Sequence, residues 1–122
     1  MDKPIRIPGP DHPITVVPAA SRLRVTLDGR VLADTSHALT LTEAHYPAVH
    51  YIPRKDVDMA RLTRSAHQTY CPYKGECSYF DLSSADGRGT NAVWTYEAPF
   101  EAVAAIKDHL AFYPDRVQIE RI

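Results

Sequence analysis

The fold class follows first from residues 23–33, which read Leu23-Arg24-Val25-Thr26-Leu27-Asp28-Gly29-Arg30-Val31-Leu32-Ala33. Apolar and polar side chains alternate before Asp28-Gly29 and apolar residues resume after it, a pattern typical of strands that bury one face. Asp and Gly both tolerate a positive φ, and this dipeptide between two such segments is the strongest local indication of a hairpin. The stretch therefore predicts two antiparallel strands joined by a tight turn.

Other short β-rich segments lie on both sides of this hairpin. They cover residues 14–17, 38–42, 48–52, 92–96 and 117–119. A second hairpin is predicted where an aromatic-rich stretch is interrupted by Pro72-Tyr73-Lys74-Gly75, because proline fixes φ and glycine accepts a left-handed conformation. Its strands are expected at residues 68–71 and 76–82. Many short strands at regular spacing predict an antiparallel sheet rolled into a small barrel or sandwich.

One helix is expected, over Pro99–Ala111. Pro99 suits a first helical position, and Pro114 follows the segment. Five residues fall on or near one helical stripe, namely Phe100, Val103, Ala104, Lys107 and Leu110. The sequence therefore predicts a mainly β domain of the α+β class, with a single C-terminal helix packed on the sheet.

Length and composition indicate one globular domain. The chain has 122 residues, of which 44% are hydrophobic and 24% are charged, and both fractions are ordinary for a folded protein. Residues 1–13 are rich in proline and are expected to form an irregular arm. Residues 14–122 are expected to form the single β-rich domain.

Charge and cysteine content narrow the expected partners and location. The net charge is −1, with 14 basic and 15 acidic side chains and no basic block, which argues against a nucleic-acid partner. No apolar stretch approaches the ~20 residues of a membrane span, and residues 1–10 lack the apolar run of a secretory signal. Cys71 and Cys77 are accordingly expected as reduced thiols of a cytoplasmic protein.

The densest group of reactive side chains lies in residues 67–75. On a strand, His67 and Cys71 share one face, and Lys74 would project from the turn beside Cys71, where an ammonium favours the thiolate form. One interpretation is a polar pocket in which Lys74 binds an anion, Tyr73 adds an apolar wall, and His67 or Cys71 performs any chemistry. The alternative is a hairpin whose aromatic rings fill the core and whose Lys74 is solvated.

A second group combines aromatic and polar side chains from two other predicted strands. Trp94 and Tyr96 would share a strand face, and Asn91 precedes them, as in sites that hold a planar ligand between rings and an amide. Tyr51 and Arg54 end another strand, where a guanidinium can bind a phosphate or carboxylate with two hydrogen bonds. The alternative interpretation is that Trp94 fills the core and that an exposed Arg54 pairs with Asp56 or Asp58.

Metal ligands are sparse in the sequence. Asp56-Val57-Asp58 would allow two carboxylates to share Mg²⁺ on an extended segment, whereas Asp56 is also suited to cap a short helix. Cys71 and Cys77 do not have the spacing of a zinc knuckle, and the six histidines are scattered. No metal site is therefore predicted, and the cofactor stays unknown.

Five segments resemble a bacterial and fungal family of domains of unknown function, number four-two-seven, which is also labelled nucleotidyltransferase-like. The resemblance spans residues 23–117, and its most specific part is Cys-Pro-x-Lys-Gly followed by Ala-x-Trp-x-Tyr. It implies a compact β-rich fold, in a family with no established general activity. The Gly-Ser and Asp-x-Asp elements of nucleotidyltransferases are absent. The segments are Asp28–Asp34, Tyr51–Val57, Thr69–Gly75, Asn91–Tyr96 and Phe112–Val117.

Three functions remain open from the sequence. The first is binding of a small anionic or planar metabolite in a polar and aromatic pocket built by residues 71–75, 51–54 and 91–96. The second is a non-catalytic protein-interaction module or a homodimer formed through the proline-rich arm and exposed tyrosines. The third is a Mg²⁺-dependent nucleotidyl or phosphoryl transferase that uses Asp56 and Asp58. The first requires that three distant segments surround one hollow.

Overall fold

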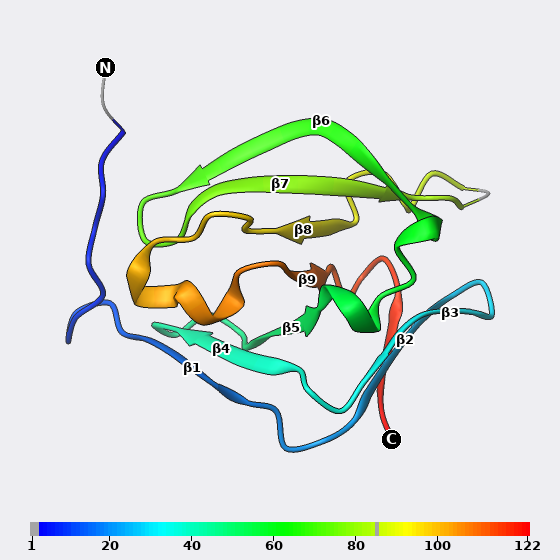
Figure 1. Ribbon diagram of the computed structural model, residues 1–122, viewed down its shortest axis with the longest axis horizontal. Coiled ribbons are helices and arrows are strands. Elements are labelled where there is room, and N and C mark those ends of the chain that lie inside the picture. Colours follow the sequence, from blue (N-terminus) through cyan, green and yellow to red (C-terminus); the bar gives the residue numbers. More distant parts are fainter. Residues whose placement is uncertain (1–2, 85) are drawn as a thin grey trace.

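The larger of two antiparallel sheets contains seven strands in the order β1–β4–β5–β9–β8–β7–β6 (Figure 1). The computed structural model describes residues 3–84 and 86–122. Every neighbouring pair in this sheet is antiparallel. In chain order, its strands are β1 (Ile14–Pro18), β4 (Leu39–Glu43), β5 (Val49–Pro53), β6 (Leu62–Cys71), β7 (Gly75–Leu82), β8 (Val93–Thr95) and β9 (His109–Phe112).

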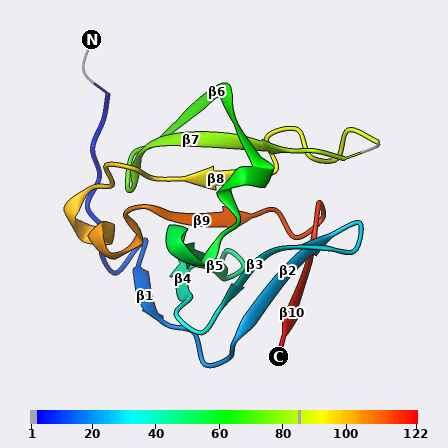
Figure 2. The same ribbon diagram turned by 45° about the vertical axis from the view of Figure 1, so that its right-hand side comes forward.

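The smaller sheet has three strands in the order β10–β2–β3. They are β2 (Leu23–Leu27), β3 (Arg30–Thr35) and β10 (Gln118–Arg121), and Figure 2 shows them side by side. Strands β2 and β3 form the hairpin predicted from the sequence. Asp28 and Gly29 have φ values of 51° and 77°, so the turn uses the left-handed backbone that this dipeptide accepts.

The second predicted hairpin is also present. Strands β6 and β7 pair from Leu62↔Leu82 to Cys71↔Gly75, and Gly75 has a φ of 109°. The register of β6 shifts between Arg64 and Gln68, and the strand bends there (Figure 2). A bulge of this kind re-aims the strand, so the two halves of β6 follow different directions.

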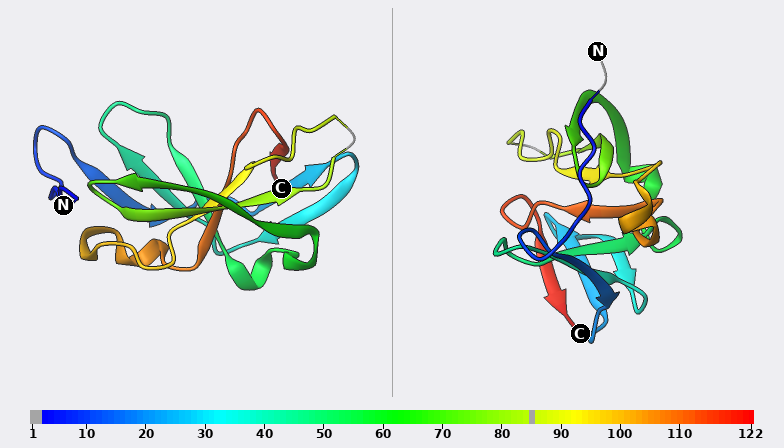
Figure 3. Two further views of the ribbon diagram at one scale, coloured as in Figure 1. Left: turned by 90° about the horizontal axis from the view of Figure 1, so that it is seen from above. Right: turned by 90° about the vertical axis from the view of Figure 1, so that its left-hand side faces the viewer.

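Of the two predicted forms, a barrel or a sandwich, the closed barrel is not confirmed. Strands β1 and β6 stand at the two edges of the larger sheet, and each has one partner strand within the described residues. Figure 3 shows the molecule from two further sides, with the sheet curved and its edges apart. The mainly β class is confirmed, and it takes the form of two antiparallel sheets.

The predicted helix over Pro99–Ala111 is wrong. The segment forms the 3-10 turns of η3 (Glu101–Ile106), which Val103 interrupts with φ −127° and ψ 28°, and it then enters β9 as a central strand. Asp108 has a φ of 56°, which redirects the chain from turn to strand. Two further 3-10 turns, η1 (Arg54–Asp56) and η2 (Met59–Arg61), precede β6. None of the described helical turns has the length and apolar character needed to cross a bilayer.

The larger sheet separates two groups of buried side chains. We call the group shared with the smaller sheet the aliphatic core, and the group on the opposite face the tyrosine cluster. Strands β5, β7, β8 and β9 contribute to both groups through alternate residues. The aliphatic core includes Leu23, Val25, Leu27, Leu32, Ile52, Phe80, Leu82, Val93, Leu110 and Phe112. The tyrosine cluster contains Leu41, Tyr51, Cys77, Tyr79, Tyr96, Val103, Ile106 and Ala111, with Trp94 packed against it.

Residues 3–13 run along one end of the β6–β7 hairpin without forming a helix or strand (Figure 1). The backbone N–H of Arg6 donates to the carbonyl of Pro72 at 2.9 Å. The hydroxyl of Tyr70 donates to the carbonyl of Pro4 at 2.6 Å, and Lys3 forms an ion pair with Glu76. The segment is therefore attached to the hairpin by three polar contacts.

The loop after β7 returns to the end of that strand at Gly89. The backbone N–H of Leu82 donates to the carbonyl of Gly89 at 2.8 Å, and the N–H of Gly89 donates to Oγ of Ser84 at 3.0 Å. A Cβ atom at position 89 would lie 1.7 Å from the carbonyl oxygen of Leu82. Glycine is required there because the two backbones approach too closely for any side chain.

Candidate functional site

A pocket of about 230 Å³ opens on the face of the larger sheet that carries the tyrosine cluster. Strands β4, β5, β7 and β8 and neighbouring loops supply its walls. Half of the lining residues are aromatic, and two others, a lysine and a glutamate, carry opposite charges. The lining consists of Leu41, Glu43, Tyr46, Pro47, Val49, Tyr51, Lys74, Cys77, Tyr79, Trp94, Tyr96 and Tyr113.

The polar end of this pocket is an ion pair between Lys74 and Glu43. Nζ of Lys74 donates to Oε1 of Glu43 at 2.6 Å, and the side chains are only 11% and 16% exposed. The turn after β6 places Lys74, and the last residue of β4 is Glu43. Nζ also lies 6.0 Å from the centre of the Tyr96 ring. The pair therefore places two opposite charges in the lining of an aromatic pocket.

His12 from the N-terminal segment binds the other oxygen of Glu43. Its Nε2 donates to Oε2 at 2.7 Å, and its ring stacks on Tyr73 at 4.1 Å with an interplanar angle of 6°. Burial raises the pKa of Glu43, but hydrogen bonds from Lys74 and His12 outweigh burial and hold this pKa below its ordinary value. Glu43 is therefore ionised at neutral pH.

The aromatic wall is organised around Trp94. Nε1 of Trp94 donates to the hydroxyl of Tyr51 at 3.2 Å, and the ring of Tyr113 lies 4.4 Å from that of Trp94. The hydroxyl groups of Tyr79 and Thr69 are 2.9 Å apart. Burial raises the pKa of Tyr51, as it does that of Tyr79 and of Tyr96. These phenols are therefore neutral hydrogen-bonding groups.

The two cysteines lie near this wall as free thiols. Cys77 lines the pocket, and burial raises the pKa of its thiol, which disfavours the reactive thiolate. Sγ of Cys71 lies 3.7 Å from Nζ of Lys74. Both thiols face the tyrosine cluster, with Cys71 next to the ion pair.

The structure brings together four of the residues predicted as a ligand site. Tyr51, Lys74, Trp94 and Tyr96 line the same pocket, although they come from three distant segments of the chain. The predicted Tyr73 does not line it, but reaches its polar end through the stack on His12.

Three other predicted residues lie elsewhere. Arg54 contacts the ring of Phe80 in the aliphatic core and pairs with Glu97 at 3.7 Å. Asn91 has a φ of 52°, and its N–H donates to Oδ1 of Asp81 at 2.8 Å, so it is a turn residue. His67 is exposed and lies against Tyr79, with the ring centres 4.6 Å apart.

His67 and Cys71, the predicted catalytic pair, lie apart on the same strand, β6. They are four positions apart on β6, which corresponds to roughly 13 Å of extended chain. No hydrogen bond between described side chains joins the two. His67 and Cys71 are therefore not in contact, and only Cys71 is close to the polar end of the pocket.

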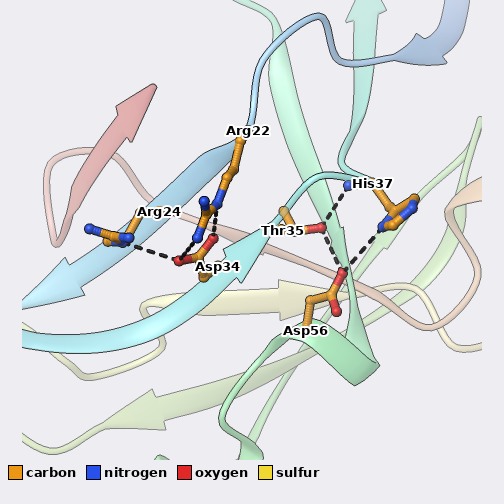
Figure 4. A network of polar contacts seen from close by, with 6 residues as sticks. All are labelled: Arg22, Arg24, Asp34, Thr35, His37 and Asp56. Atoms are coloured by element: carbon orange, nitrogen blue, oxygen red, sulfur yellow. Dashed lines mark hydrogen bonds and ion pairs between the residues drawn. The ribbon is translucent and has the colours of Figure 1, made fainter. Parts of the chain in front are cut away.

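The carboxylates of Asp56 and Asp58 are engaged separately. The hydroxyl of Thr35 donates to Oδ2 of Asp56 at 2.7 Å, and the N–H of His37 donates to that hydroxyl at 2.9 Å (Figure 4). Asp58 instead accepts a hydrogen bond from Nε of Arg61 at 3.0 Å. Within residues 3–84 and 86–122, no group of three or more acidic, histidine or cysteine side chains is placed to hold a metal ion.

The same region contains an exposed arginine pair around Asp34 (Figure 4). Nε and Nη2 of Arg22 donate to the two oxygens of Asp34 at 2.7 and 2.9 Å. Nε of Arg24 donates to Oδ2 at 3.2 Å. Hydrogen bonding to Arg22 lowers the pKa of Asp34, and the network joins the start of β2 to β3.

Sequence reasoning missed Glu43 and His12 as parts of the site. A signal for Glu43 was present, because it continues the alternation of Leu39 and Leu41 and so shares their face. No local signal pointed to His12, because its role depends on how residues 3–13 lie against the hairpin. Tyr46 and Tyr113 also line the pocket, and nothing in the sequence assigned them to it.

Comparison with known protein families gives one result. The model of the family described as "Domain of unknown function (DUF427)" matches residues 15–122. Among curated proteins, nothing matches the chain. The family match therefore covers every residue that lines the pocket and both sheets except Ile14, and it supplies no activity or ligand.

Proposed function

The chain belongs to this family of domains of unknown function, so its role has to be inferred from the pocket, and we propose that it binds a small planar molecule there. The observation that carries this proposal is the largely buried Lys74–Glu43 pair beside an aromatic wall. The ligand would insert its ring between aromatic side chains. Its polar edge would face the ion pair.

The size and lining of the pocket support a ligand of about one or two rings. Binding sites for drug-sized molecules usually measure roughly 300–1,000 Å³, whereas this pocket measures about 230 Å³. Its rim includes Tyr46, which is 56% exposed, and Tyr113, which is 36% exposed. Exposed rings beside a half-buried Trp94 offer stacking surface at the entrance.

The charges at the polar end favour the planar alternative over a simple anion. Lys74 offers N–H donors, but Glu43 lies 2.6 Å away and is itself ionised. An anion at Lys74 would therefore meet a carboxylate, and the repulsion would offset the attraction. A ligand that presents an acceptor to Lys74 and a donor to Glu43 satisfies both groups.

The test uses three probes that share a ring and differ at the polar edge. Benzamide carries a donor and an acceptor, benzoate carries acceptors only, and benzamidinium carries donors only. Trp94 is the single tryptophan of the chain, so its fluorescence reports on this pocket. We expect benzamide to change the emission at the lowest concentration of the three, by at least threefold.

Substitution of the ion pair provides the control. Lys74→Met should abolish the preference for benzamide, while Lys55→Met, which removes an exposed lysine outside the pocket, should preserve it. The double variant Lys74→Met, Glu43→Leu keeps the test valid if the single variant is unstable, because it leaves no unpaired charge. Equal responses to all probes, or none, would reject the proposal.

If none of the probes binds, the alternative function to test is a protein-interaction module or a homodimer. In that case the exposed rings of Tyr46 and Tyr113 would serve a protein surface instead of a ligand. The molar mass in solution, compared between the natural chain and the variant Tyr46→Ala, Tyr113→Ala, decides this. A dimer that dissociates in the variant would support an assembly role, and a monomer throughout would exclude the homodimer.

A further inference from the structure

A second, larger hollow lies outside the tyrosine pocket, and we propose that it binds a small amphiphilic carboxylate. This cleft measures about 480 Å³ and lies where the β2–β3 hairpin meets η2 and the ends of the β6–β7 hairpin. It shares no lining residue with the tyrosine pocket. The proposal therefore stands independently of the planar-ligand proposal.

The floor of the cleft is apolar. Leu27, Leu32 and Leu82 line it, and these side chains belong to the aliphatic core with exposures of only 6%, 4% and 5%. Their outer atoms form the base of the hollow while their packing fixes its shape. A hydrocarbon group placed there would cover apolar surface without displacing any hydrogen bond.

The rim of the cleft carries two guanidinium groups. Arg61 donates to Asp58 through Nε at 3.0 Å, which leaves its Nη groups available in the fork geometry that suits a carboxylate. Arg30 follows the turn of the β2–β3 hairpin and is exposed. Across the described part of the chain, no ion pair within 4.0 Å engages Arg30.

The remaining polar groups of the rim set the charge of the ligand. Asp81 is the one acid that lines the cleft, and its Oδ1 accepts the N–H of Asn91 at 2.8 Å. Thr63 and Ser83 add hydroxyl groups. Asp58 already pairs with Arg61, whereas no described acid lies within 4.0 Å of Arg30, so one positive charge of the rim is left without a partner. The fitting ligand therefore has one carboxylate for Arg30, with the free Nη groups of Arg61 beside it, and an apolar body for the leucine floor.

The experiment compares three six-carbon probes that differ only in charge. Hexanoate is an anion, hexanamide is neutral and hexylammonium is a cation. In the whole chain with ¹³C-labelled leucine methyl groups, we expect hexanoate to shift the NMR signals of Leu27, Leu32 and Leu82. Its affinity should exceed that of hexanamide at least tenfold, because hydrogen bonds to charged partners are the stronger ones.

Substitution on the rim separates charge recognition from apolar contact. Arg30→Met should weaken hexanoate binding roughly tenfold and leave hexanamide binding unchanged. Arg121→Met is the matched control, since Arg121 is exposed on β10 and does not line the cleft, and it should bind hexanoate as the natural chain does. Unchanged methyl spectra of the free variants would establish that both fold.

Three outcomes would overturn the proposal. These are equal affinity for the three probes, unchanged hexanoate binding in Arg30→Met, and shifts that appear around Trp94 instead of the three leucines. The last outcome would assign the probe to the tyrosine pocket. Because the fluorescence of Trp94 is read separately, failure of this cleft and failure of the planar-ligand site remain distinguishable.

Discussion

The two faces of the larger sheet are built from the same strands but differ in what they bury. Leu110 and Phe112 of β9 enter the aliphatic core, while Ala111 between them enters the tyrosine cluster. The first face packs against a second sheet with aliphatic side chains. The second face keeps a pocket that contains a buried ion pair. The aliphatic core and the face that carries the pocket thus use alternate residues of the same strand, a division that period-two geometry allows.

The largest expected effect tests whether the aliphatic core carries most of the stability. Leu110 is fully buried, and Leu110→Ala should lower the free energy of unfolding by about 3 kcal/mol, because a cavity adds to the lost apolar burial. Val49→Ala in the half-buried wall of the pocket should cost less than about 1 kcal/mol. Urea denaturation measures both free energies of unfolding. Equal losses in the two variants would show that the two faces contribute equally to stability.

The second effect tests the ion pair of the tyrosine cluster. Lys74→Met should destabilise the fold by about 2 kcal/mol, because it leaves the buried carboxylate of Glu43 without its main donor. The double variant Lys74→Met, Glu43→Leu should recover at least half of this loss, since apolar replacements of a buried pair are often neutral. A single variant as stable as the natural chain would show that Lys74 is in effect solvated.

The third effect concerns acid. The folded pKa of Glu43 lies below its ordinary value of 4.5, so the unfolded chain binds the proton more readily. The stabilisation is therefore complete above pH 4.5 and is lost as the pH falls through the folded pKa. The natural chain should exceed Glu43→Gln by about 1 kcal/mol at pH 7, with a difference that shrinks in acid. A constant difference down to pH 3 would contradict this.

The smallest effect refines the description of the aromatic wall. Tyr51→Phe removes the oxygen that accepts Nε1–H of Trp94 at 3.2 Å and should cost about 0.5 kcal/mol. The emission maximum of Trp94 should shift, because its indole N–H loses a fixed partner. A Tyr46→Phe variant provides the comparison, since the Tyr46 side chain is largely exposed at the rim, and its emission should be unchanged.

Local turn chemistry explains what the sequence predicted well. Asp28-Gly29 and Gly75 occupy the left-handed conformations that their residue types accept, so both hairpins could be located from short segments. Trp94 and Tyr96 were expected to share a face, and they line the same pocket. In each case, neighbours in sequence determine the geometry, and no distant contact is needed to read it.

The predicted helix failed because a central strand and a helix can share one hydrophobic pattern. Residues 110–112 read Leu-Ala-Phe and are buried on both faces of the sheet, and periodicity alone does not distinguish such a run from a buried helix. Tertiary contacts decided the outcome, since β9 pairs with both β5 and β8. The positive φ of Asp108 carried no clear signal in the sequence.

Only the aromatic half of the candidate site could be predicted from the sequence, again because distant contacts decide the rest. Its aromatic members belong to strands that the alternation pattern located, whereas its charge balance depends on Glu43 and His12. Glu43 bonds Lys74 across 31 positions of sequence, and His12 bonds Glu43 across another 31, so the pairing of charges follows from the fold. From the sequence, Lys74 alone suggested a site for an anion. The ionised Glu43 beside it disfavours an anion there.

The close approach at Gly89 has a consequence for how this chain can vary. A methyl group there would have to displace the backbone of Leu82, and the Leu82 side chain forms part of the floor of the larger cleft. A substitution at Gly89, which does not itself line the cleft, would thus deform the cleft floor by displacing Leu82. Position 89 is closed to the other nineteen amino acids for reasons of space alone.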